Sequence, residues 1–150
     1  MIIPYSEIET YVGFKIIRRL LPWIAVTLCN PKNPSISVSP LGLIDSGSDV
    51  TMVDREIGTY LDYKIESGRR DIISGVGGGK TDGYFHEAGF IIYDPRRKEK
   101  PIKYLDDVFF AKEPFPKTNP QQTAIFGTLG FFKHTIVTFS FPEHIEVCAK

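Results

Sequence analysis

The feature that most constrains this chain is a succession of short segments rich in β-branched and aromatic residues, each bounded by turn-forming residues. The clearest turn signal is Asn30-Pro31-Lys32-Asn33-Pro34, which separates two of these segments. The expected strands are residues 23–29, 35–39, 41–44, 71–74, 81–93, 104–111 and 135–141. Helical spacing is confined to one short segment, for which Asp54 is the predicted N-cap and Ile57, Tyr60 and Leu61 the apolar face. The sequence therefore predicts an all-β, barrel-like fold with one or two short helices.

The whole chain, residues 1–150, is expected to form a single domain with an ordinary hydrophobic core. The structure of the N-terminal segment, residues 1–21, is left open because residues 16–21 suit a strand or a helical turn. Residues 71–93 are expected to form a hairpin around a glycine-rich tip. Residues 94–122 are expected to form a charged and proline-rich excursion that contains the strand at 104–111.

The charge balance argues against nucleic acid or a membrane surface as a partner, because 18 basic and 18 acidic residues cancel. Cys29 and Cys148 are expected to be free thiols, since two distant cysteines make neither a disulfide framework nor a metal pair. His86, His134 and His144 lack metal-ligand spacing, so we expect no metal and no cofactor. Without a signal peptide or a membrane-spanning run, the expected compartment is the cytoplasm.

The stretch of residues 41–51 carries the clearest chemical signal. The apolar run 41–44 is expected to be a fully buried strand that delivers Asp45 into a tight turn eased by Gly47. A carboxylate in that place is costly unless it accepts hydrogen bonds or shares charge with a partner. The simpler interpretation is that Asp45 merely caps a turn, because Asp, Ser and Gly are all common turn residues.

The order of the residues after this strand favours a catalytic role. Asp45, Ser46, Gly47, Ser48, Asp49 and Thr51 resemble the active-site loop of retropepsin-like (retroviral-type) aspartic proteases, in the form of a single-domain cellular or prokaryotic member. Two further elements resemble the family in the same order: Ile125-Phe126-Gly127, which in the family leads into a short helix, and an alternating tail at residues 135–142. The resemblance covers roughly residues 22–147.

The resemblance implies a closed β-barrel that functions as a twofold homodimer, with Asp45 as the catalytic residue. It also implies roles for the rest of the loop, in which Ser46 bonds across the dimer axis and Gly47 and Asp49 bind the substrate backbone. Thr51 and Gly127 would support the loop. The hairpin at residues 71–93 would be the flap that closes over substrate, with its tip at Gly75, Val76, Gly77 and Gly78.

Acid–base hydrolysis of a peptide bond needs one group that takes a proton from water and one that gives a proton to the substrate. Two adjacent carboxylates that share one proton meet this need. The chain has one Asp-Ser-Gly, so a homodimer that pairs two Asp45 side chains is the expected aspartic endopeptidase, and its substrate is a peptide or protein. The Ser48 hydroxyl is expected to donate to the Asp45 carboxylate, which would lower the pKa values of the pair and move activity to more acidic pH.

Three other functions are compatible with parts of the sequence. A non-catalytic dimerisation or peptide-binding module could retain the same fold without turnover. Residues 74–81 come within one residue of a nucleotide-binding P-loop, although the strand-like segment after them disfavours the required helix. Ser46 or Ser48 could suggest a serine nucleophile, but the GxSxG elbow is absent.

Overall fold

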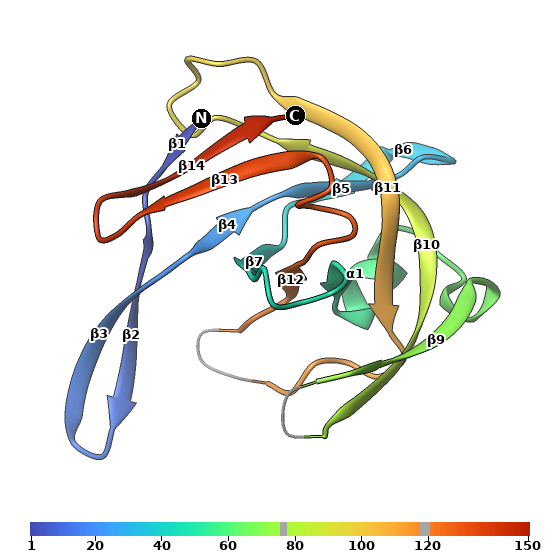
Figure 1. The fold of residues 1–150 in the computed structure, drawn as a ribbon. Helices are drawn as coiled ribbons and strands as arrows, with labels where there is room; N and C mark the ends of the chain where they lie inside the picture. Colours follow the sequence, from blue (N-terminus) through green and yellow to red (C-terminus); the bar gives the residue numbers. More distant parts are fainter. Residues whose placement is uncertain (76–77, 118–120) are drawn as a thin grey trace.

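The computed structural model describes residues 1–75, 78–117 and 121–150, which fold mostly as strands (Figure 1). One α-helix, α1 (Arg55–Tyr60), and one 3₁₀ turn, η1 (Ile65–Ser67), complete the fold. The strands are β1 (Ile2–Ile3), β2 (Ser6–Val12), β3 (Lys15–Leu21), β4 (Trp23–Ala25), β5 (Thr27–Asn30), β6 (Asn33–Val38), β7 (Leu41–Ile44), β8 (Met52–Val53), β9 (Arg69–Ser74), β10 (Lys80–Ile92), β11 (Ile102–Ala111), β12 (Ala124–Phe126), β13 (Thr135–Ser140) and β14 (His144–Ala149). The all-β class expected from the sequence is confirmed.

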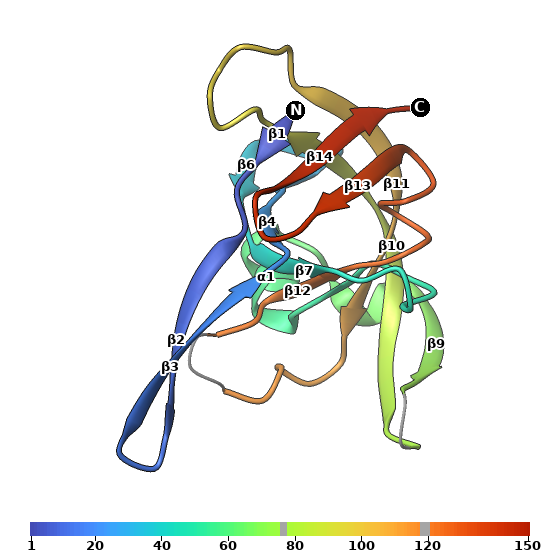
Figure 2. The same ribbon diagram turned by 60° about the vertical axis from the view of Figure 1, so that its left-hand side comes forward.

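The main sheet has nine strands and curls strongly around the core (Figures 1 and 2). Its order is β4-β7-β12-β8-β11-β10-β5-β6. The ninth strand, β9, pairs with the N-terminal half of β10, residues 80–85. Only Val26 separates β4 at one edge from β5 near the other edge, and its backbone N–H donates to the Pro40 carbonyl at 3.3 Å. The chain itself therefore bridges the two ends of the curled sheet.

The core fills the inside of this curl with fully buried aromatic and aliphatic side chains. The largest of them are Phe90, Phe109, Phe110, Phe126 and Phe131. Alternation along the strands creates this core, because every second side chain of a strand points inward. The expectation that residues 41–44 form a fully buried strand was wrong, because their side chains also alternate between the core and the surface. Ile44 is buried, but Leu41 is exposed, since β7 covers the core with one face only.

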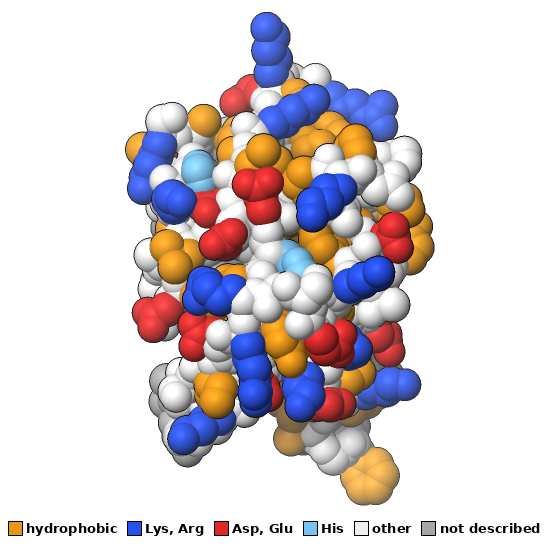
Figure 3. All heavy atoms as spheres, turned by 90° about the vertical axis from the view of Figure 1, so that its right-hand side faces the viewer, with side chains coloured by type: hydrophobic (Ala, Val, Ile, Leu, Met, Phe, Trp, Pro, Cys, Tyr) orange, Lys and Arg blue, Asp and Glu red, His pale blue; other side chains and the backbone are white. Residues whose placement is uncertain are grey.

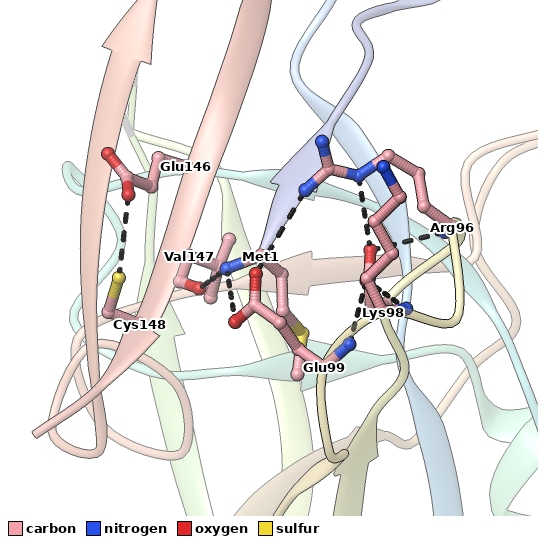
Figure 4. A network of polar contacts seen from close by, with 8 residues as sticks. Met1, Arg96, Lys98, Glu99, Glu146, Val147 and Cys148 are labelled. Carbon is pink, nitrogen blue, oxygen red and sulfur yellow. Dashed lines mark hydrogen bonds and ion pairs between the residues drawn. The ribbon is translucent and has the colours of Figure 1, made fainter.

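The two ends of the described chain meet in a second sheet of three strands, ordered β1-β14-β13. The Met1 amino group donates to the Val147 carbonyl at 2.7 Å and pairs with the Glu99 carboxylate at 3.3 Å (Figure 4). Glu99 belongs to the charged turn that follows β10. That turn is built around Asp94, whose buried carboxylate accepts hydrogen bonds from the backbone N–H groups of Arg96, Lys98 and Glu99.

The segment left open by the sequence, residues 1–21, consists of strands. After β1 the chain forms an antiparallel hairpin of β2 and β3 that stands away from the rest of the molecule in both ribbon views (Figures 1 and 2). Residues 16–21 could not be assigned from their pattern because most of β3 is exposed on both faces. When both faces of a strand are exposed, its apolar and polar residues need not alternate, so the sequence carries no strand pattern.

Residues 94–122 contain the strand expected at 104–111, which is present as β11 and lies near the middle of the main sheet. It pairs with β10 over ten residues on one side and, through Phe109 and Phe110, parallel with β8 on the other. Val108, Phe109 and Phe110 are completely buried, so the second half of β11 belongs to the core.

The short helix predicted after Asp54 is confirmed as α1, and the Asp54 carboxylate caps it by accepting from the Glu56 N–H at 2.7 Å. The helix that the resemblance implies after Gly127 is absent, because residues 128–134 form successive turns. Within these turns Gly130 has a left-handed φ of +87°, which is incompatible with a continuous right-handed helix through this position. The turns are held against β11 by Asp106, which bonds Lys133 at 3.1 Å and His134 at 2.6 Å.

The surface carries charges of both signs. Over the face that Figure 3 presents, basic and acidic side chains are interspersed with apolar ones. Among the described residues, no helix is long and apolar enough to cross a membrane.

Candidate active site

The candidate site rests on the parallel pairing of β7 with β12, two strands that lie about eighty residues apart. Their register sets Ile44 opposite Phe126, and the Asp45 N–H extends the pairing by donating to the Phe126 carbonyl at 3.0 Å. A glycine at position 42 is needed for this contact, because a Cβ there would lie 2.7 Å from that of Ala124. The two loops that leave these strands, at Asp45 and at Gly127, therefore emerge side by side.

Backbone hydrogen bonds join the two loops into one unit. From the second loop, the Thr128 N–H donates to the Ser48 carbonyl at 2.8 Å and the Leu129 N–H to the Asp49 carbonyl at 3.0 Å. In return, the Thr51 N–H donates to the Leu129 carbonyl at 2.7 Å. The conformation of the Asp45 loop is thus fixed by residues near the other end of the chain.

Thr51 and Gly127 lie at the centre of this unit. Thr51 is completely buried, and its hydroxyl accepts the Gly127 N–H at 3.2 Å. A Cβ on Gly127 would collide with the backbone of Ser48 and Val50. These positions suit the supporting role that the resemblance implies for both residues.

Gly130 is a support that sequence reasoning did not identify. Its φ is +87°, and a Cβ there would lie 2.8 Å from both the Thr51 side chain and the Asp107 carbonyl. Its short distance in sequence from Gly127 is the signal that could have indicated it.

The Asp45 carboxylate lies half-buried at the end of β7. Its Oδ1 accepts the Gly47 N–H at 2.9 Å. Within the described part of the chain, Oδ2 accepts no hydrogen bond, so this oxygen can bind a water molecule or a second carboxyl group. Ser46, Gly47 and Asp49 are exposed beside it. Their roles at a dimer axis and on substrate stay predictions, because those roles depend on molecules outside this chain.

The Ser48 hydroxyl does not contact the Asp45 carboxylate, contrary to the expectation from the sequence. It donates to the Val50 carbonyl at 2.8 Å, within its own loop. A hydroxyl has one proton to donate, so this bond competes directly with one to Asp45. The Ser48 hydroxyl therefore supports its own loop and is not a partner of the Asp45 carboxylate.

The hairpin expected around the glycine-rich tip is present, since β9 pairs with β10 from Arg69 and Phe85 up to Ser74 and Lys80. Near the tip, the Gly75 N–H donates to the Gly79 carbonyl at 2.8 Å, and Gly78 has a φ of +83°. Val76 and Gly77, two of the predicted substrate-binding residues, lie outside the described residues.

The two strands of this hairpin are joined by a bidentate ion pair. The Arg70 guanidinium donates to the two carboxylate oxygens of Asp82, with N–O distances of 3.0 and 2.8 Å.

The P-loop interpretation is wrong, because Lys80 begins a strand and no helix N-terminus follows it to bind phosphate.

A small apolar groove lies between this hairpin and the strands of the site. Its volume is about 280 Å³, and it is lined by Met52, Thr81, Phe115, Pro116, Gln122 and Ile125. Met52 and Ile125 pair across β8 and β12, and the main chain of Phe126, the next residue, holds Asp45. Sequence reasoning missed these residues, because Phe115 and Pro116 lie in a proline-rich loop that carries no periodic signal.

Comparison with known proteins finds no family model and no curated protein that matches this chain. Among the described residues, no group of three or more His, Cys, Asp or Glu side chains is arranged to hold a metal ion.

Proposed function

We propose that this chain is an aspartic endopeptidase with the retropepsin-like fold, which functions as a twofold homodimer with one Asp45 from each subunit. One observation carries the proposal. A half-buried carboxylate with one oxygen unoccupied by described residues is held at the end of a strand by a loop that the far end of the chain fixes in place. Such rigidity suits catalysis, which requires reactive groups in a preorganised position.

The turn-capping alternative explains less of this geometry. A capping carboxylate needs only the bond between Asp45 Oδ1 and the Gly47 N–H. It does not require the buried Thr51 hydroxyl, the left-handed Gly130 or the glycine at 127, all of which hold the backbone of the loop. This amount of support is expected where the position of a side chain matters for chemistry.

In the proposed mechanism the two Asp45 carboxyl groups share one proton, because two adjacent negative charges repel each other. The ionised carboxylate takes a proton from a bound water, whose oxygen attacks the scissile carbonyl carbon. The protonated carboxyl gives its proton to the carbonyl oxygen. The C–N bond of the tetrahedral intermediate then breaks as the carboxyl that took the proton from water gives it to the nitrogen, while the other carboxylate takes a hydroxyl proton back, which restores the pair with one proton. Neither a metal nor a cofactor is required.

The β9–β10 hairpin and the 280 Å³ groove suit an extended peptide as substrate. Apolar residues line most of the groove, and it lies beside the strand that holds Asp45. We expect a side chain of an apolar substrate residue to enter it, while the hairpin covers the peptide backbone.

The decisive experiment is hydrolysis of a peptide library at several pH values by the wild-type chain and by Asp45→Asn, with and without a transition-state-like inhibitor of aspartic proteases. Asp45→Asn should lower hydrolysis by about 10³-fold or more, since it removes an essential catalytic group. The inhibitor should block the wild-type activity.

Asp62→Asn is the matched control for this experiment. Asp62 is exposed, lies outside the site and has a left-handed φ of 63°, which Asn tolerates. We expect it to retain activity. Hydrolysis by Asp45→Asn at the wild-type rate would refute the proposal, and tight peptide binding without any cleavage would identify a non-catalytic peptide-binding module instead.

A further inference from the structure

Among the described strands, only β2 and β3 contribute no residue to the two hydrophobic core clusters. Its strands pair with each other from Ser6 and Leu21 to Val12 and Lys15. A single two-stranded hairpin is marginally stable in water, and it usually needs packing against another element. Near its base Ile8 is buried and Leu20 and Leu21 are half-buried, so the outer half of the hairpin, residues 10–17, is the part that lacks a packing partner among the described residues.

Large apolar side chains gather on the outer half of the hairpin. Tyr11 and Ile16 are paired on one face, and Phe14 forms the tip. On the other face Val12 and Ile17 lie beside their partners Lys15 and Thr10. Tyr11 is 70% exposed and Phe14 is fully exposed, whereas the charged pair of Arg18 and Glu9 is confined to the inner half. Apolar side chains gathered at one end of an exposed element mark an interaction surface.

The base of the hairpin adjoins the candidate catalytic carboxylate. Pro22, directly after β3, accepts the Ile44 N–H at 2.9 Å, and Asp45 follows Ile44. On the other strand, the Ser6 hydroxyl donates to the Trp23 carbonyl at 3.0 Å. The hairpin thus begins where the proposed function places the twofold axis.

The hairpin is long enough to extend over a second subunit. Its strands have seven residues each, which corresponds to about 20 Å. A domain of this size has a radius of gyration of about 15 Å. Figures 1 and 2 show that it extends to the same end of the molecule as the β9–β10 hairpin, with β7 and β12 between the two. When the Asp45 of a second copy is placed beside Asp45, as the proposed function requires, that copy lies next to the β2–β3 hairpin.

We propose that the β2–β3 hairpin is a dimerisation arm whose apolar outer half packs on a second copy of this chain. The inference rests on the proposed function, because the twofold axis at Asp45 identifies the partner. The arm supplies the contact area that two small loops around Asp45 lack, since a stable interface buries about 800 Å² on each partner. The dimer then unites the two carboxylates that hydrolysis needs.

The test compares three proteins by analytical ultracentrifugation over a range of concentrations: wild type, the arm variant Tyr11→Ser with Phe14→Ser, and the control variant Tyr93→Ser with Leu105→Ser. The control residues are 55% and 56% exposed and lie on the main sheet or directly after it. The arm variant should raise the dimer dissociation constant by about tenfold or more, the size expected when interface aromatics are truncated. The control variant should dimerise like wild type.

A photo-crosslinking residue at position 14 tests the contact without truncating the arm. After light- and heavy-isotope chains are mixed, crosslinks should join a light chain to a heavy chain. The absence of such crosslinks, a monomeric wild type or an arm variant with unchanged dimerisation would overturn the proposal. Flotation of wild type with lipid vesicles that is lost in the arm variant, at unchanged dimer mass, would overturn it in favour of a lipid surface.

These outcomes separate the arm from the proposed function. Arm-dependent dimerisation without any peptide hydrolysis would retain the arm and reject the endopeptidase. Hydrolysis that Asp45→Asn abolishes, together with arm-independent dimerisation, would retain the endopeptidase and reject the arm. Asp45→Asn itself should dimerise like wild type, because its substitution leaves the arm unchanged.

Discussion

The Ser48 hydroxyl donates within its own loop and does not contact the Asp45 carboxylate. This contact predicts the effect of a substitution at position 48. Ser48→Ala removes the bond to the Val50 carbonyl, and the part-buried carbonyl loses its donor. We expect a loss of about 0.5–1.5 kcal/mol in the free energy of unfolding, measured with urea. The pH–rate profile should stay where it is. A shift of that profile to higher pH would show that the hydroxyl donates to Asp45 in the active dimer.

Asp94 gives a prediction about pH. Burial of its carboxylate opposes ionisation, but the backbone N–H groups of Lys98, Arg96 and Glu99, with the Arg96 guanidinium, bind the ionised form and hold its pKa below the usual value (Figure 4). A lowered pKa means that the carboxylate stabilises the fold above its unfolded pKa of about 3.9, and that this stabilisation is lost as the pH falls through the lower folded pKa.

Asp94→Asn should therefore unfold more easily than wild type at neutral pH, with a difference that shrinks in strong acid. Urea denaturation at a series of pH values measures this difference. The control is Glu113→Gln, an exposed carboxylate in the described chain. A difference between Asp94→Asn and wild type that is independent of pH would mean that the side-chain oxygens matter and the charge does not.

At the residue scale, the roles of Gly127 and Thr51 as supports of the Asp45 loop were expected from the resemblance. The structure gives a physical reason for both residue types, because the contacts around position 127 exclude a Cβ and the Thr51 hydroxyl accepts the Gly127 N–H. The direction of the Ser48 hydroxyl was not predictable, because several acceptors lie within reach and only the folded loop decides between them. Gly130 was missed for a similar reason, since its left-handed φ follows from the turns that pack beside Thr51.

At the scale of the elements, α1 shows packing overriding intrinsic propensity. Gly58 lies inside this helix, where Ala would normally be better by about 1 kcal/mol. A Cβ at position 58 would lie 2.8 Å from Phe110 and 2.9 Å from Ile65. Overpacking of this kind costs about 1–3 kcal/mol. We therefore expect Gly58→Ala to lower the free energy of unfolding despite its better helix propensity.

Thr59→Ala is the control for this prediction, because Thr59 is the exposed neighbour in the same helix. It should leave the stability of the protein unchanged or slightly raise it. Thermal and urea unfolding of both variants measure the two effects. A stabilised Gly58→Ala variant would show that Phe110 and Ile65 can shift to make room.

Local patterns predicted most of the strands, and the short helix with its cap. Local patterns did not predict the features that depend on contacts with other parts of the chain, such as the position of a strand in the sheet. The segment 94–122 looked like an excursion because prolines and charges dominate its ends, yet β11 between them is central. The helix expected after Gly127 came from resemblance alone, and the structure has turns there, with Gly130 in a left-handed conformation. The order β7-β12-β8 was not predictable, because parallel pairing between distant strands leaves no mark within either strand.

At the scale of the whole molecule, the proposed dimer predicts how active and inactive subunits combine. If each site needs two Asp45 side chains, mixed dimers that contain one Asp45→Asn subunit are inactive. After exchange of subunits, a threefold excess of Asp45→Asn should reduce the hydrolysis by a fixed amount of wild type to about one quarter, as random pairing in a closed dimer requires. Unchanged hydrolysis would show that a single wild-type subunit works alone.

The long-range pairing at the candidate site determines when the Asp45 loop can take its folded shape. The bond from Gly127 to the Thr51 hydroxyl joins residues 76 positions apart, and the loop that carries Asp45 is tied to residues 126–129. Contacts of such separation form late, because closing a long loop of chain costs entropy before any contact repays it. A ribosome therefore exposes the Asp-Ser-Gly sequence long before it completes the segment that shapes it. The proposed endopeptidase activity would therefore be absent from a nascent chain until residues 126–129 have been made.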